Sequence, residues 1–139
     1  TINPSAELAF NAGAHPILSL CTNGKLCPHQ TYTSGENHEF HQKTKKGKGK
    51  LLTPKNFPAP EGVVWHLLLP VSKGWGAGEE SRFNIATLRD RVDHINAEGG
   101  AVTFDVPITG DGVIPPAVLR VLKNLGKDID KLTDGARSF

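Results

Sequence analysis

The chain of 139 residues contains no methionine, only two cysteines and one tyrosine, and no long apolar run. Its longest apolar stretch, residues 63–71, is interrupted by His66 and Pro70, whereas a membrane-spanning helix needs roughly 18 apolar residues or more. We therefore expect no membrane span. The first residues, Thr-Ile-Asn-Pro, lack the basic start and apolar middle of a secretory signal. The chain is accordingly expected to be intracellular, already processed, or an internal piece of a longer protein.

A strong excess of one charge is also absent. With 16 Lys and Arg against 14 Asp and Glu the net charge is +2, which falls short of the concentrated charge of a dedicated nucleic-acid-binding protein. Cys21 and Cys27 flank an Asn-Gly pair that favours a tight turn, so a disulfide and two separate thiols are both open. The composition, 37% hydrophobic and 22% charged, is typical of one globular unit, predicted over residues 1–139.

The first part of the chain has little periodicity. Ser5 begins a short apolar-periodic segment that Gly13 ends, which predicts a short helix. A brief apolar run, Pro16–Cys21, predicts a buried strand. From Thr22 to Pro60 the sequence predicts one long folded-back loop, of which residues 37–60 form an insert containing a lysine-glycine run.

The second part alternates strand and helix patterns. Gly62–Val71 is near-continuously apolar, as strands buried on both faces of a parallel sheet are, and a glycine-rich loop over residues 72–78 follows it. A helix is predicted from Asn84 or Thr87 to about Ala97, and a strand over residues 101–107.

A turn at Thr109–Gly112 and a helix beginning at Pro115–Pro116 complete the pattern. This alternation predicts an α/β fold of parallel βαβ units, in an open sheet or a barrel. No strand is followed by the glycine fingerprint of a nucleotide site, because the glycines of residues 74–78 have the wrong spacing. We expect no cofactor.

Several segments together resemble family 29 glycoside hydrolases, the α-L-fucosidase type. They are, in chain order, Ala9–Ile17, Tyr32-Thr-Ser-Gly-Glu36, Trp65-His66-Leu67, Gly74-Trp-Gly76 and the most specific, Gly99-Gly-Ala-Val-Thr-Phe-Asp-Val-Pro-Ile-Thr-Gly-Asp-Gly-Val-Ile-Pro115. The resemblance implies the last strands of a (β/α)₈ TIM barrel, a partial barrel whose site lies on loops after the strands' carboxyl ends.

The resemblance also implies roles for individual residues. Glu36 takes the place of the general acid/base, and Trp75 that of the aromatic residue lining the sugar pocket. Trp65, His66 and Asp105 are the further substrate-binding candidates. The implied partner is a fucosylated glycan or another carbohydrate, and we expect a secreted or extracellular protein.

The chemistry of a retaining glycosidase requires two carboxylates about 5 Å apart, a nucleophile and an acid/base. In the family the nucleophile is an Asp upstream of every segment matched here, and a whole barrel takes about 250 residues. We therefore expect the C-terminal portion of an enzyme, with a companion chain or segment completing the barrel. By itself the chain is expected to lack retaining glycosidase activity.

Rival interpretations stay open. The lysine run and the loop histidines His38 and His41 suit a small basic ribonuclease or ribosome-directed toxin, although we expect no nucleic-acid partner. Trp65 and Trp75 suit a non-catalytic carbohydrate-binding module. Of the histidines His29, His38 and His41, the last two lie within reach of one ion, to which Glu36 or Glu39 could add an oxygen ligand. Their spacing is not the helical zinc pattern, so no metal is predicted. Asp105 is also expected to pair with a loop amide, because a carboxylate on an apolar strand needs a partner.

Overall fold

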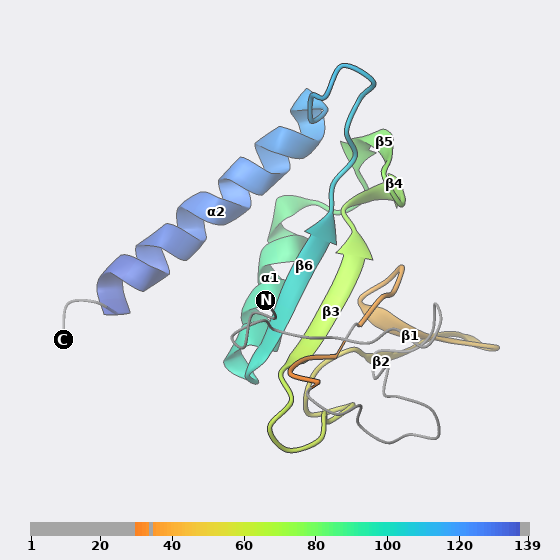
Figure 1. Cartoon of the computed structure of the whole chain (residues 1–139), viewed down its shortest axis with the longest axis vertical. Coiled ribbons are helices and arrows are strands. Elements are labelled where there is room, and N and C mark those ends of the chain that lie inside the picture. Colours follow the sequence, from red (N-terminus) through yellow and green to blue (C-terminus); the bar gives the residue numbers. More distant parts are fainter. Residues whose placement is uncertain (1–29, 34, 137–139) are drawn as a thin grey trace, which may run out of the picture. The chain divides into compact units, whose positions relative to one another are not determined.

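The computed structural model describes residues 30–33 and 35–136. The helix and strand predicted before residue 22 and the Cys21–Cys27 pair lie outside these residues. The elements are, in chain order, β1 (His41–Thr44), β2 (Gly47–Leu51), β3 (Trp65–Pro70), β4 (Ser72–Gly74), β5 (Ala77–Ser81), α1 (Ile85–Ala97), β6 (Gly100–Asp105) and α2 (Pro116–Ala136) (Figure 1).

The described residues divide into two compact units. Unit 1 comprises the described residues up to 69 together with 92–103, and unit 2 comprises residues 70–91 together with 104–136. The boundaries fall inside β3, α1 and β6, so these three elements contribute to both units.

Strand β3 belongs to a two-stranded parallel sheet (Figure 1). It is hydrogen-bonded to β6, and the two strands run in the same direction with α1 connecting them (Figure 1). Residues 31–33 and 35–37 run along the opposite edge of β3, with parallel bridges from Tyr32 to Val64 and from Glu36 to Leu68. The β3–α1–β6 segment therefore has the parallel βαβ form that the strand and helix patterns predict. Its place in a partial barrel stays a prediction.

The prediction that β3 is buried on both faces is wrong for the described structure. Trp65, Leu67 and Leu69 are buried, whereas His66 and Leu68, on the alternate face, are half-exposed. Burial in unit 1 is therefore one-sided, and its apolar core comprises Phe40, Leu52, Trp65, Leu67, Leu69, Val92 and Ile95. An apolar run alone does not reveal which face other elements cover, because that depends on packing from distant parts of the chain.

Residues 37–60, expected as a loop insert, contain the antiparallel hairpin of β1 and β2. Its ends are closed by a hydrogen bond from the Leu52 amide to the Phe40 carbonyl (2.8 Å), and both of these side chains are buried. The strands themselves are polar and mostly exposed, so they lack the apolar alternation by which a strand is recognised in a sequence. For that reason the sequence predicts a loop here.

The glycine-rich segment 72–78, predicted as a loop, instead begins the antiparallel hairpin of β4 and β5 in unit 2. Trp75 and Gly76 form its tip, and Gly76 has a φ of 60°, which favours glycine. The Ser72 hydroxyl donates to the Ala77 carbonyl at 2.6 Å and holds the strands together. Very short strands rich in glycine resemble loops in sequence, which explains the error.

Helix α1 begins and ends close to the predicted positions, and α2 begins at Pro116 as predicted. The side chain of Asn84 accepts a hydrogen bond from the Thr87 amide at 2.8 Å, which confirms Asn84 as the N-cap of α1. In α2, Val118 and Leu125 are buried in unit 2, where the helix packs against β5. Among the described residues, no helix is both long enough and apolar enough to cross a bilayer.

Candidate functional site

The polar candidates of unit 1 gather on the half-exposed face of β3. We define the open face as Tyr32, Glu36, His66, Leu68 and Thr103. Glu36 is the bridge partner of Leu68, which shares a face of β3 with His66, and the His66 ring contacts Thr103 of β6. The ring of Tyr32 meets that of His66 edge-on at 5.4 Å between centroids. Three parallel segments thus bring one carboxylate, one imidazole and two hydroxyls to one surface.

His66 is held in one tautomer by its two neighbours. Its Nδ1 lies 3.1 Å from the carbonyl oxygen of Thr33, and its Nε2 lies 2.8 Å from the Thr103 hydroxyl. A carbonyl oxygen can only accept, so Nδ1 carries the hydrogen and donates. In the neutral ring Nε2 therefore accepts from the Thr103 hydroxyl. The imidazole is fixed in orientation by residues on both sides of its strand.

A close approach of two backbones sets the position of Glu36. Gly35 has a φ of 60°, and a Cβ at this position would overlap the carbonyl oxygen of His66. The Thr33 hydroxyl donates to the same His66 carbonyl at 3.0 Å and accepts from the His66 amide at 2.9 Å. Within the segment Tyr32-Thr-Ser-Gly-Glu36, threonine and glycine therefore have structural reasons that are independent of the resemblance.

Glu36 lies at the end of the segment that is bridged to β3. The Leu68 amide donates to the Gly35 carbonyl at 3.0 Å, and the Asn37 amide donates to the Leu68 carbonyl at 2.8 Å. The Asn37 side chain then accepts from the His38 amide at 2.8 Å, which turns the chain away from β3. Glu36 is half-buried at this carboxyl end, the end at which parallel α/β folds place functional groups.

Trp65 lies on the opposite, buried face of β3. It is 2% exposed, and its indole N–H donates to the Phe57 carbonyl at 2.8 Å. A Cβ at Gly100 would meet both Trp65 and Ile95, so the indole packs tightly between β6 and the end of α1. A ring with this environment supports the sheet and does not present a surface to a ligand.

Asp105 and Trp75 belong to unit 2. Oδ2 of Asp105 accepts the Gly76 amide at 2.6 Å, and its backbone carbonyl accepts the Val71 amide at 3.0 Å. The predicted pairing of Asp105 with a loop amide is thereby confirmed. The carboxylate fixes the tip of the β4–β5 hairpin, on which Trp75 is half-exposed.

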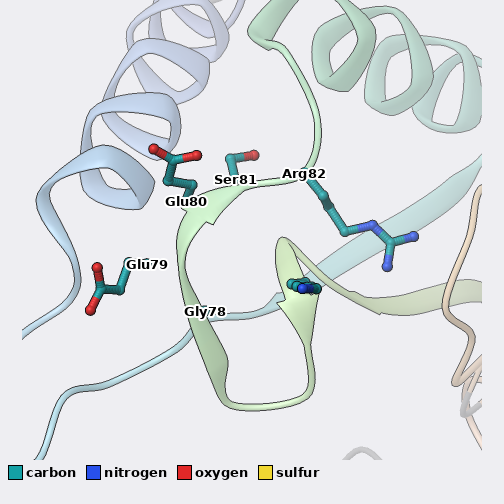
Figure 2. Close-up of a pocket in the computed structure, with 6 residues that line it drawn as sticks. Gly78, Glu79, Glu80, Ser81 and Arg82 are labelled. Carbon is teal, nitrogen blue, oxygen red and sulfur yellow. The ribbon is translucent and has the colours of Figure 1, made fainter.

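A cavity of about 370 Å³ also lies in unit 2, along β5. Its lining consists of Lys73, Gly78, Glu79, Glu80, Ser81 and Arg82. Figure 2 shows Glu79 and Glu80 projecting on the side of α2, whereas Arg82 projects on the other side of the strand. No site residue predicted from the sequence lines this cavity.

Glu98, which was not predicted as a site residue, links the end of α1 to the turn after β2. Glu98 has a side chain that is 7% exposed, accepts the Lys55 amide at 2.8 Å, and lies 3.2 Å from Nε2 of His94. The hydrogen bond from the Lys55 backbone, aided by the Thr53 side chain and the charges of Lys55 and His94, lowers the pKa of Glu98. Its role is structural, since it fastens two segments of unit 1.

Metal ligation finds no support among the described residues, which contain no group of three or more His, Cys, Asp or Glu side chains arranged to hold an ion. His29, one of the histidines considered, lies outside them. Thr33, Gly35 and Thr103 were not predicted as site residues. The glycine immediately before Glu36 is the only one of the three with a recognisable sequence signal, because glycine often marks a close backbone approach.

Comparison with known proteins gives one partial similarity. A peroxisomal Lon protease homolog 2 of Caenorhabditis elegans is 34% identical over 68 residues, which are 49% of this chain. The chain spans only about 8% of that protein's length. No family model and no solved structure matches. A similarity of this extent assigns the chain to no family.

Proposed function

We propose that the chain is the C-terminal part of a retaining glycoside hydrolase acting on α-L-fucosides, with Glu36 as its general acid/base. The observation that supports this best is the position of Glu36 at the end of a segment bridged in parallel to β3, on the open face that it shares with His66 and Thr103. The resemblance of Tyr32–Glu36 and Gly99–Pro115 to family 29 glycoside hydrolases supplies the substrate class.

The open face suits a sheet that is completed by further strands. In a closed barrel the side chains opposite the helices fill the interior, and the active site lies above them at the carboxyl ends. For the open face to lie inside such a barrel, a companion segment or chain has to enclose its polar side chains. The proposal therefore keeps the expectation that the partner half supplies the nucleophile.

The proposed chemistry assigns each group one task. Glu36, protonated, gives its proton to the departing glycosidic oxygen and later removes one from the attacking water. His66 and Thr103 offer hydroxyl-binding groups in a fixed orientation. Trp65 supports the sheet of unit 1 from its buried face. In unit 2, Asp105 holds the hairpin tip that bears Trp75, the residue to which the resemblance gives a sugar-lining role.

Aryl α-L-fucoside cleavage with azide as an external nucleophile tests the role of Glu36. Azide forms a C–N bond to the anomeric carbon while the C–O bond to the aryl group breaks, and Glu36 gives its proton to the leaving oxygen. We expect azide-dependent release of the phenol by the chain, lost in Glu36→Gln and retained in the neighbouring Glu39→Gln. Because the nucleophile is expected elsewhere, little release should occur without azide.

Two results would contradict the proposal. Equal azide-dependent release by Glu36→Gln would remove the acid/base assignment. Nuclear magnetic resonance titration with α-L-fucose that leaves the His66 and Thr103 signals unmoved, at concentrations that saturate related sugar sites, would remove the substrate assignment. Robust cleavage without azide that disappears in Glu36→Gln would instead place a nucleophile within this chain.

A further inference from the structure

The positive charge of the chain is concentrated in one segment. Residues 40–60 contain six of the 16 Lys and Arg residues and none of the 14 Asp and Glu residues. The rest of the chain is consequently acidic. This separation is hidden by the net charge of +2, and neither the proposed cleavage chemistry nor the packing of the sheet explains it.

The β1–β2 hairpin presents most of these charges. Lys45 and Lys46 form its turn between Thr44 and Gly47, and Lys48 and Lys50 lie two residues apart on one face of β2. All four lysines are exposed. The other face of β2 is closed at Gly49, where a Cβ would meet Thr44 and Gln42. We call Lys45, Lys46, Lys48 and Lys50 the lysine hairpin.

The positive charges of the lysine hairpin are not paired with acidic groups of the described residues. No ion pair among the described residues involves any of its four ammonium groups. Clustered like charges repel one another and oppose folding. The hairpin is nevertheless anchored at its base by the buried side chains of Phe40 and Leu52. An anchored hairpin that carries four clustered ammonium groups suits a multiply charged anionic partner.

The position of the lysine hairpin connects it with the proposed acid. Both belong to unit 1, and β1 begins only five residues after Glu36. We propose that the lysine hairpin binds an anionic glycan, one with sulfate or carboxylate groups along its chain, and holds it beside the cleavage site. This inference rests on the proposed function and names the substrate class, an acidic polysaccharide or oligosaccharide, for that site.

The residue types on the hairpin favour a glycan over a nucleic acid. No arginine occurs between residues 30 and 81, and the hairpin has no exposed aromatic ring, since Phe40 is buried. Arginine supplies the bidentate contacts to bases and phosphates, and aromatic rings supply the stacking on which single-strand binding depends. Lysine acts as a flexible point charge that suits sulfate or carboxylate groups of varied spacing.

Binding of the whole chain to soluble polymers tests the inference without requiring any turnover. The probes are dextran sulfate, polygalacturonate, neutral dextran and duplex DNA, each at low and at physiological ionic strength. The hairpin variant is Lys45→Gln, Lys46→Gln, Lys48→Gln and Lys50→Gln combined. The matched control removes the same charge from exposed residues of unit 2, by combining Lys73→Gln, Arg120→Gln, Lys123→Gln and Lys127→Gln.

We expect dextran sulfate, polygalacturonate or both to bind, with neutral dextran inactive. The hairpin variant should lower that affinity at least about tenfold and the control less than about threefold, with the difference shrinking at higher salt. The relative affinities for the two acidic glycans identify sulfate or carboxylate as the preferred group. Circular dichroism should be unchanged in both variants, because the replaced side chains are exposed.

Three outcomes would overturn the inference. The variants would weaken binding equally if net charge alone attracted the polymer. Hairpin-dependent binding that is tighter for duplex DNA than for either acidic glycan would favour a nucleic-acid partner. Absence of binding to both glycans at low salt would leave the hairpin without this role. Repeating the measurement in Glu36→Gln separates the two proposals, since loss of cleavage there should leave glycan binding intact.

Discussion

The two faces of β3 use the same alternating strand for different purposes. One face bears Trp65, Leu67 and Leu69, which are buried against other parts of unit 1. The other bears His66 and Leu68, which stay half-exposed beside Tyr32 and Glu36. Because side chains alternate between the two faces of a strand, the residues that stabilise β3 and the residues of the open face are separate sets. A substitution on one face should therefore leave the other face intact.

Leu67→Ala should give the largest effect. Leu67 is fully buried, and truncating a buried leucine removes apolar contacts and leaves a cavity, at a cost of about 2–5 kcal/mol in the free energy of unfolding. Denaturant titration measures it. Leu68→Ala on the open face is the matched control and should cost less than about 1.5 kcal/mol. Equal losses for the two variants would show that both faces are packed alike in solution.

Gly35→Ala tests the close approach that positions Glu36. Alanine at a φ of 60° is strained by about 1–3 kcal/mol, and its Cβ would in addition overlap the His66 carbonyl oxygen. We expect a larger loss of unfolding free energy than for Gly62→Ala, which has a φ of 78° with nothing within 4 Å of the added atom. Similar losses at both glycines would contradict the backbone contact.

Thr103→Val tests the orientation of His66 on the open face, because it removes the hydroxyl that faces Nε2 of His66. Since this hydrogen bond is exposed, its loss should cost only about 0.5 kcal/mol. The informative measurement is the nitrogen chemical shifts of the His66 ring, which should report Nδ1–H in the parent chain and a changed Nε2 in the variant. A ring protonated at Nε2 alone in the parent chain would refute the assigned tautomer.

Glu98→Gln should give the smallest effect at neutral pH and a clear one in its pH dependence. The pKa of Glu98 in the folded chain is lowered from the ordinary value of 4.5, so its ionised form stabilises the fold above that value. This contribution is lost as pH falls through the lowered pKa. The Tm of the parent chain should therefore fall more steeply than that of Glu98→Gln between about pH 5 and pH 3.

Glu61→Gln provides the control for that titration, because Glu61 is exposed. Its Tm should follow the parent profile. A Glu98→Gln profile that runs parallel to the parent over the acidic range would show that the Lys55 amide and the Thr53 side chain do not stabilise the ionised carboxylate.

Local signals predicted part of this molecule. Asn84 marked the start of α1, the apolar runs marked β3 and β6, and the need of Asp105 for a partner anticipated its bond to the Gly76 amide. The polar hairpin of β1 and β2 was missed because neither strand has an apolar face. The assignment of Glu36 came from the resemblance and stays a proposal.

The sequence by itself determined the order of strand and helix, the cap of α1 and the concentration of lysine after residue 40, because these depend on residues close together in the chain. Only the tertiary structure decided which face of β3 is open and which tautomer His66 adopts. The face depends on the packing of Trp65, Leu67 and Leu69 into the core, and the tautomer depends on Thr33 and Thr103, which lie 33 and 37 residues from His66 along the chain. Contacts across such separations leave no periodic pattern in the sequence, since each partner is a single small polar residue outside any distinctive local motif.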